Sequence, residues 1–142
     1  MQPVHLKWHD GMFLEADAPS GYTVTLDGSA KAGGQGRGFL PSELLLTALG
    51  GCTSMDILSL LAKFHASPVS FDVELSGTRK EVRPKSFASI TAVYRINGEI
   101  DPQQALKAVQ SSFEKYSVVA NSLNAELHYR VVVNGREIPR EK

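Results

Sequence analysis

The longest apolar stretch of the chain runs from Leu40 to Leu61. Apolar side chains fall on nearly every side of a helical turn of about 3.6 residues. Charged side chains are few, with Glu43 near the start and Asp56 in the second half. Pro41 favours a helix that begins here, because the first helical position has no backbone hydrogen bond for proline to remove. The pattern predicts a buried central helix, enclosed by other protein.

Two adjacent glycines, Gly50 and Gly51, interrupt this predicted helix. Each costs about 1 kcal/mol relative to alanine in a helix interior. The pair therefore predicts that another backbone or a ligand comes close just before Cys52. That residue is the single cysteine of the chain.

Alternating apolar and polar positions predict strands on both sides of this helix. The alternating runs cover residues 4–9, 12–16, 22–26, 69–75, 87–96 and 127–133. Asp10-Gly11 joins the first two runs and favours a tight hairpin turn. The last strand should turn at Asn134-Gly135 into a polar tail.

A second helix is predicted to begin after Asp101, a preferred capping residue, with Pro102 in its first position. One apolar stripe follows it, made of Leu106, Val109, Phe113 and Tyr116. Because most strands alternate and few pairs are separated by a helix, antiparallel pairing is favoured. The chain is expected to be an α+β protein with antiparallel sheets packed around the buried central helix, plus the second amphipathic helix. Its 142 residues, without a repeat, predict one domain over 1–142.

The glycine-rich segment 33–38 lies between a strand and the central helix, where a phosphate-binding loop could occur. Its glycine spacing differs from the dinucleotide fingerprint, and the Lys-Ser/Thr of a P-loop is missing. A flexible connector is favoured over a phosphate cradle.

Charge and composition exclude several classes of partner. Fifteen basic and fifteen acidic residues cancel, and no basic stripe occurs, so neither nucleic acid nor an anionic membrane is expected as a partner. The first residues lack an apolar signal region, and polar residues interrupt the long helix, which favours a cytoplasmic protein that does not span a membrane. A lone cysteine suits a reducing compartment and cannot build a zinc site of the Cys-pair type. His5 and His9 would lie about 13 Å apart on a strand, and neither a metal nor a cofactor is expected.

Cys52 has two possible roles. A single cysteine on an apolar helix usually packs as a small hydrophobic residue. A reactive thiolate needs positive potential, and Cys52 lies beyond the first helical turn, where the dipole acts. Asp56, about 40° around the helix from Cys52, would disfavour the anion if both faced one pocket. Activation would then require a cation, for which the sequence offers Arg37, Arg79, Arg83 and Lys115.

Three segments, 41–55 with Cys52 in it, 77–87 and 113–123, occur in an order that resembles the OsmC/Ohr family of thiol-dependent hydroperoxide reductases. The resemblance implies an OsmC-like fold that forms an intertwined homodimer, with the reactive sites at the interface. It also implies that Cys52 is the peroxidatic cysteine, which attacks a peroxide as a thiolate and becomes a sulfenic acid.

The same resemblance identifies further site residues. Ser117 stands at the position of the family's resolving cysteine and is not expected to react, so an internal two-cysteine cycle is ruled out. In the N-terminal region of the family's activating arginine the chain has Lys7, and its first arginine is Arg37. The family's buried glutamate matches Ser42, next to Glu43. Arg37 and Glu43 are therefore the candidate groups to support the cysteine.

Two functions follow from this sequence. The first is a one-cysteine peroxidase of oxidative-stress defence, which reduces a small organic hydroperoxide and is restored by an external thiol. The second is a non-catalytic dimer of the same fold that binds a small apolar ligand.

Overall fold

The computed structural model describes residues 3–140 and divides into two compact units, Met1–Leu45 and Leu46–Lys142. The boundary falls inside the first long helix, α1 (Pro41–Lys63), so its first turn belongs to one unit and the remainder to the other. Each unit contains one sheet. A single domain over residues 1–142 stays a prediction.

The N-terminal unit is built on an antiparallel sheet of three strands in the order β1-β2-β3. The strands are β1 (His5–Asp10), β2 (Phe13–Asp17) and β3 (Thr23–Leu26), as the alternating pattern predicts. The hairpin turn lies one residue later than expected, because Asp10 pairs with Phe13. Its two loop residues are therefore Gly11, which has a φ of 54°, and Met12.

One carboxylate holds the loop between β3 and α1. The Asp27 side chain, in a residue that is 2% exposed, accepts the backbone N–H groups of Gly28 at 2.8 Å, Gln35 at 3.0 Å and Arg37 at 3.2 Å. Gly34 passes so close to the Gly28 carbonyl that a Cβ would lie 1.7 Å from its oxygen. The glycine-rich segment is held by these hydrogen bonds and has no room for a side chain at Gly34, and its predicted flexibility stays a prediction. The loop also contains a short helical turn, η1 (Ala30–Ala32).

The C-terminal unit contains a four-stranded sheet in the order β4-β5-β6-β7. The strands are β4 (Ser70–Arg79), β5 (Phe87–Asn97), β6 (Glu126–Val133) and β7 (Arg136–Glu137). β4 and β5 pair antiparallel as predicted, whereas β5 and β6 are parallel. The expected all-antiparallel arrangement fails at this pair because α2 (Pro102–Ser111) carries the chain back across the sheet before β6 begins. The predicted polar tail begins with β7, which pairs with β6.

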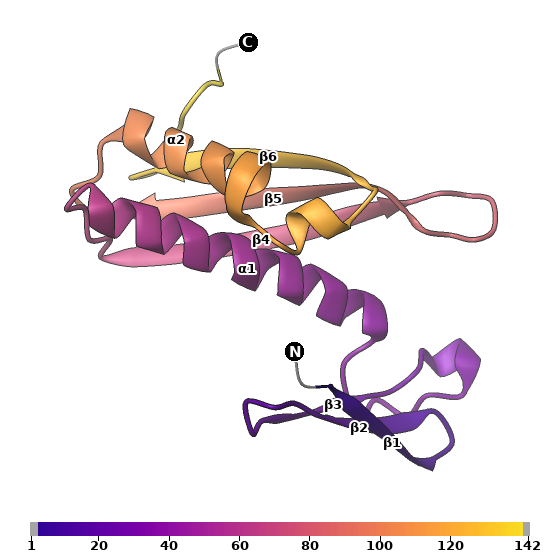
Figure 1. The fold of residues 1–142 in the computed structure, drawn as a ribbon. Helices are drawn as coiled ribbons and strands as arrows, with labels where there is room; N and C mark the ends of the chain where they lie inside the picture. The colour runs from indigo at the N-terminus through magenta and orange to yellow at the C-terminus, as the bar shows by residue number, and fades with distance from the viewer. Residues whose placement is uncertain (1–2, 141–142) are drawn as a thin grey trace. The chain divides into compact units, whose positions relative to one another are not determined.

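The two helices lie along the same face of the β4-β5-β6 sheet (Figure 1). Alternate residues of β5 turn toward this face and are buried, with Tyr94 completely inaccessible. From α1, Ile57 and Leu61 join the same core, and from α2, Ala105 and Val109 do so. The hydrophobic core of the unit thus lies between one face of the sheet and one side of each helix.

The chain itself covers one side of α1. Its buried residues are Leu49, Gly50, Thr53, Ile57 and Leu61. On other sides Met55 is 72% and Leu58 39% exposed, so a single chain does not enclose the helix as the sequence pattern predicts. By length and apolar composition alone α1 could cross a membrane, a test that core helices also pass.

Only one of the two central glycines is explained by packing within the chain. A Cβ on Gly50 would lie 2.6 Å from Cδ1 of Leu75, so the sheet comes close at this point. A Cβ on Gly51 would meet no atom within 4 Å among the described residues. The close approach at Gly50 is thus made by side chains of Leu75 and Val73 and not by another backbone, and the approach of a ligand stays a prediction.

The apolar stripe predicted for the second helix ends early. Leu106 and Val109 are buried, but Tyr116 is 55% exposed. After Ser111 the helix continues as a π-helical turn, η2 (Ser112–Tyr116), followed by a short turn η3 (Ala120–Ser122). A π turn holds more residues than an α turn, so the side chains beyond it rotate away from the stripe.

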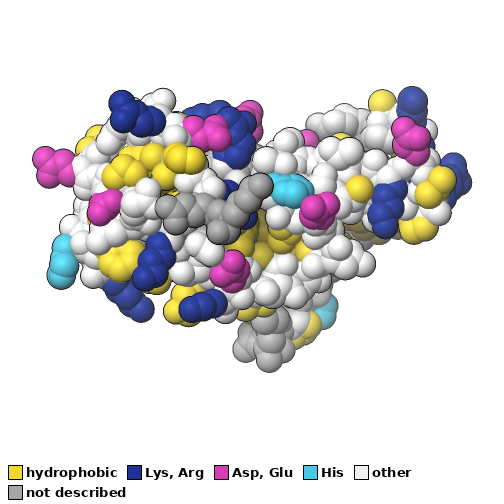
Figure 2. All heavy atoms as spheres, turned by 90° about the horizontal axis from the view of Figure 1, so that it is seen from above, with side chains coloured by type: hydrophobic (Ala, Val, Ile, Leu, Met, Phe, Trp, Pro, Cys, Tyr) yellow, Lys and Arg dark blue, Asp and Glu magenta, His cyan; other side chains and the backbone are white. Residues whose placement is uncertain are grey.

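The connection between β4 and β5 is charged and exposed. It carries Arg79, Lys80, Arg83 and Lys85 around a single acidic residue, Glu81. In Figure 2 the dark-blue side chains of lysine and arginine lie at both the left and the right of the view.

Replacing Asp27 with asparagine should destabilise the N-terminal unit. Its hydrogen bond from the Gln35 N–H, with those from Arg37 and Gly28, holds the pKa of the Asp27 carboxyl below its ordinary value of 3.8. A carboxyl with a lowered folded-state pKa stabilises the protein above its unfolded pKa, and this contribution is lost as the pH falls through the folded value. The single tryptophan, Trp8, lies in this unit and reports its unfolding by fluorescence.

The Asp27→Asn variant should therefore unfold at lower urea concentration than the wild type at pH 7, with a difference that shrinks in acid. Asp17→Asn is the matched control, because Asp17 is exposed and accepts one side-chain hydrogen bond, from Thr23. Equal urea midpoints for Asp27→Asn and the wild type at pH 7 would contradict the role given to this carboxylate.

Candidate functional site

Cys52 lies in the middle of α1 and is partly buried. Its neighbour Thr53 is fully buried and fixes the rotation of the helix over the sheet. The Thr53 hydroxyl donates to the carbonyl of Leu49 at 2.8 Å and is hydrogen-bonded to the Tyr94 hydroxyl on β5. Burial raises the pKa of Tyr94 to about 12, so its hydroxyl stays protonated at neutral pH and can donate to Thr53. Cys52 consequently sits at the border between the buried and the open side of the helix.

The π-helical turn η2 lies against α1 beside this cysteine. Ser112 is fully buried, and its hydroxyl lies 3.3 Å from the carbonyl oxygen of Thr53 and 3.1 Å from Oδ2 of Asp56. The backbone N–H of Ser117 closes the turn by donating to the carbonyl of Ser112 at 2.8 Å. Five residues apart, the two serines are thereby brought to the same side of the turn, facing α1.

Ser117 contacts the cysteine directly. Its hydroxyl donates to Sγ of Cys52 at 3.2 Å and accepts the backbone N–H of Ala120 at 3.0 Å. The side-chain amide of Asn121 donates to the carbonyl of Ser117 at 2.7 Å and to that of Phe113 at 3.1 Å. Ser117 is buried, with 1% of its surface exposed.

The candidate supporting residues have other partners in the N-terminal unit. The Arg37 guanidinium lies 2.9 Å from Asp10 and 3.4 Å from Asp27, above the ring of Phe13. The hydrogen bond that the guanidinium donates to the Asp10 carboxylate is the main cause that raises the pKa of Arg37. Glu43 accepts the backbone N–H of Leu40 at 2.8 Å and so caps the start of α1. Support of the cysteine by Arg37 or Glu43 stays a prediction.

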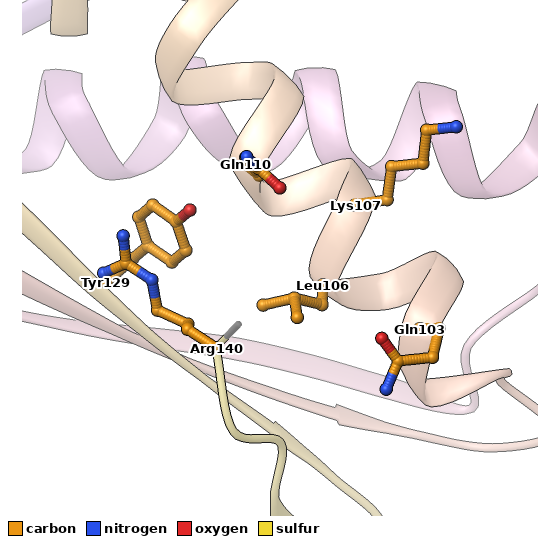
Figure 3. Close-up of a pocket in the computed structure, with 6 residues that line it drawn as sticks. All are labelled: Gln103, Leu106, Lys107, Gln110, Tyr129 and Arg140. Carbon is orange, nitrogen blue, oxygen red and sulfur yellow. The ribbon is translucent and has the colours of Figure 1, made fainter. Parts of the chain in front are cut away.

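Two of the hollows formed by the described residues belong to the C-terminal unit. The smaller, of about 100 Å³, begins one helical turn beyond Cys52 and is lined by Asp56, Ser59, Leu60, Lys63 and Tyr116. The larger, of about 380 Å³, lies between α2, β6 and the last described residues, and Cys52 does not line it. Figure 3 shows Leu106 directed into this larger groove and the Arg140 guanidinium over the Tyr129 ring, 4.1 Å from its centre.

Within residues 3–140, no group of three or more His, Cys, Asp or Glu side chains is placed to hold a metal ion. The exposed His5 and His9 lie on β1. The site that the structure does offer is therefore one sulfur with the hydroxyl beside it.

Sequence reasoning missed the residues that hold Ser117 in place, Ser112, Ala120 and Asn121. A regular α-helix would separate residues 112 and 117 by about 140° around its axis, so their common side could not be expected. Thr53 was equally hidden, because a threonine in an apolar helix gives no sign of a buried partner such as Tyr94. In the sequence, the only sign of this arrangement is Ser112, a serine five residues before Ser117.

The sequence model of the family described as OsmC-like protein matches residues 34–132. Protein YhfA of Escherichia coli strain K12 is 30% identical over 132 residues, covering 89% of this chain and 96% of YhfA. A hypothetical protein from Aquifex aeolicus VF5 has a similar structure, with a TM-score of 0.83 at 25% identity, covering 94% of this chain and 96% of the other.

An organic hydroperoxide resistance protein OsmC from Legionella pneumophila superposes with a TM-score of 0.68, covering 94% of this chain and 97% of the other. At 16% identity this likeness shows the fold alone. The family match spans more than half of the chain and includes both Cys52 and Ser117. The chain therefore belongs to the OsmC-like protein family.

Proposed function

We propose that this protein is a one-cysteine hydroperoxide reductase. The observation that carries the proposal is a partly buried cysteine whose sulfur receives a hydroxyl hydrogen bond, in a chain that has no second cysteine. Family membership supports it, and the structurally similar Legionella pneumophila protein is described as an organic hydroperoxide resistance protein.

The proposed reaction has three steps. The Cys52 thiolate attacks the distal oxygen of the hydroperoxide, the O–O bond breaks, and the alkoxide takes up a proton and leaves as the alcohol. Cys52 is then a sulfenic acid. A first small thiol displaces water from it to give a mixed disulfide, and a second small thiol attacks that disulfide and releases Cys52 with the oxidised disulfide of the two reductant molecules.

The substrate class follows from a side chain exposed next to the site. Val118, next to Ser117, is 74% exposed. An apolar side chain next to the site favours organic hydroperoxides over hydrogen peroxide. The use of free thiols as reductant fits a reducing compartment, so we place this oxidative-stress activity in the cytoplasm.

We also propose that the working form is an intertwined homodimer. The chain leaves one side of α1 uncovered, with Met55 exposed, and among the described residues no atom would lie within 4 Å of a Cβ on Gly51. Contiguous exposed apolar side chains are costly in water and favour association. A second copy placed on this side would enclose the helix as its sequence predicts.

Treatment with cumene hydroperoxide should consume the one thiol of the chain. The reaction of wild-type protein should be at least about 100-fold faster than that of free cysteine, because positioning effects of this size are common at active sites. Thiol titration measures the rate, and dimedone trapping with mass spectrometry locates the sulfenic acid at Cys52. Cys52→Ser is the control and should consume no peroxide; a wild-type rate equal to that of free cysteine would exclude the reductase.

Leu58→Glu should dissociate the dimer, since it places a charge on the uncovered side of α1. Sedimentation equilibrium should give twice the chain mass of 15.4 kDa for the wild type and the chain mass for the variant. Lys107→Glu, on the exposed side of α2, is the matched control and should stay dimeric. A monomeric wild type at micromolar concentration would refute the dimer.

One observation favours the alternative, a non-catalytic dimer that binds a small apolar ligand. Arg37, the candidate cation nearest in sequence before α1, is already engaged by Asp10 and Asp27. In that case a strain carrying Cys52→Ser in place of the wild-type protein should resist cumene hydroperoxide as well as its parent. Increased sensitivity of the Cys52→Ser strain, at equal protein level, would eliminate this alternative.

A further inference from the structure

We infer that Ser117 is a catalytic residue, a fixed hydrogen-bond donor that stabilises the thiolate of Cys52. The inference rests on the proposed function for its biological meaning. The donor itself is a property of the Cys52–Ser117 pair and is tested without peroxide. Ser117 thus has a chemical task although it cannot act as a resolving residue.

The direction of the hydrogen bond follows from the partners of the Ser117 hydroxyl. Its oxygen accepts the backbone N–H of Ala120 at 3.0 Å, which leaves its one hydrogen free for another acceptor. Sγ of Cys52 lies 3.2 Å away in the direction that this hydrogen can take. A thiolate has no proton to give, so in the reactive form of Cys52 the serine must be the donor.

The surrounding contacts keep this donor in place. Asn121 holds the carbonyl of Ser117 at 2.7 Å, and Ser112 is bonded to the carbonyl of Thr53 at 3.3 Å. The turn that carries Ser117 is therefore tied to the same helix that carries Cys52. Because the donor is already oriented in the reduced protein, forming the anion needs little reorganisation.

A hydroxyl in this position has two chemical effects. It stabilises the anion relative to the thiol, which increases the fraction of thiolate at neutral pH. It also withdraws electron density, which lowers the reactivity of each thiolate, since nucleophilicity falls with basicity. The other ionisable side chains on α1, η2 and β5 are Glu43, Asp56, Lys63, Glu114, Lys115, Tyr116, Tyr94 and Arg95. A substitution at Ser117 leaves all of them in place.

The test compares iodoacetamide alkylation of Cys52 in the wild type and in Ser117→Ala over a range of pH. A hydrogen bond to a charged group is worth enough to change the thiolate fraction about 10- to 100-fold. The smaller thiolate fraction of Ser117→Ala is partly offset by the higher nucleophilicity of each thiolate. The variant should therefore react about 3- to 10-fold more slowly than the wild type at neutral pH. At alkaline pH, where both thiols are ionised, it should react faster than the wild type by about the same factor.

The crossing of the two pH profiles is the decisive result. A variant that had merely loosened the fold would shift its rate in one direction at every pH. Ser122→Ala, an exposed serine in the neighbouring turn, is the matched control and should follow the wild-type profile. Ser117→Thr keeps the hydroxyl and should restore a profile of wild-type shape. Superimposable profiles for Ser117→Ala and the wild type would overturn the inference.

Peroxide separates this inference from the proposed function. If the profiles cross but wild-type protein consumes cumene hydroperoxide no faster than free cysteine, the role of Ser117 as donor is supported and the reductase function is rejected. If peroxide is consumed rapidly and the Ser117→Ala and wild-type profiles coincide, the reductase function is supported and the role of Ser117 as donor is rejected.

Ser117→Cys tests the geometry independently. With the two side-chain atoms already 3.2 Å apart, a cysteine here should reach the disulfide bond length of about 2.05 Å. One equivalent of cumene hydroperoxide should then oxidise Cys52 to the sulfenic acid, and the new thiol should displace water to close an internal disulfide. Both thiols should disappear with no added oxygen in the mass. A sulfenic acid that persists beside a free thiol would show that the two positions do not meet.

Discussion

The anchoring of the π-helical turn on α1 is the contact on which the geometry of the candidate site depends. Ser112 is bonded to the backbone of α1, and Thr53 of that helix is bonded to Tyr94 in the sheet. These contacts connect β5, α1 and η2 in one buried series of hydrogen bonds. Cys52 and Ser117 sit at its border, where Cys52 is partly buried and Ser117 is 1% exposed.

The parallel pairing of β5 and β6 makes this contact possible. A hairpin between these strands would have joined them by a short loop at one edge of the sheet. The crossover instead carries α2, η2 and η3 across the face that α1 already covers (Figure 1). The segment that contains Ser117 therefore arrives beside Cys52 although the two residues are far apart in the sequence.

Local pattern predicted most elements of the fold and little of the geometry of the site. The start of α1 at Pro41, the cap at Asp101 and the strand alternation of β4 and β5 depend on neighbouring residues, and all three are observed. The parallel β5–β6 pair was not foreseen, because alternation reports which face of a strand is buried and carries no information about strand direction.

At the site, the family resemblance indicated that positions 52 and 117 matter. Only the packing of the structure shows that the two side chains are in contact. The sequence predicts a cation as the group that activates Cys52, because a positive charge is the usual means of activating a thiol. The group found against the sulfur is a neutral hydroxyl, whose effect depends on distance and orientation, neither of which can be obtained from the order of residues. Arg37 looked available in the sequence because its carboxylate partners lie elsewhere in the chain, one of them at Asp10.

The β4–β5 connection gives the protein an electrical asymmetry that its net charge of zero conceals. Four basic side chains gather there around one acidic residue, so the remainder of the chain carries a matching excess of negative charge. An anionic surface that comes near this connection is attracted to it. Physiological salt limits this attraction to a range of about 8 Å, so it acts on molecules already almost in contact and contributes little to long-range attraction.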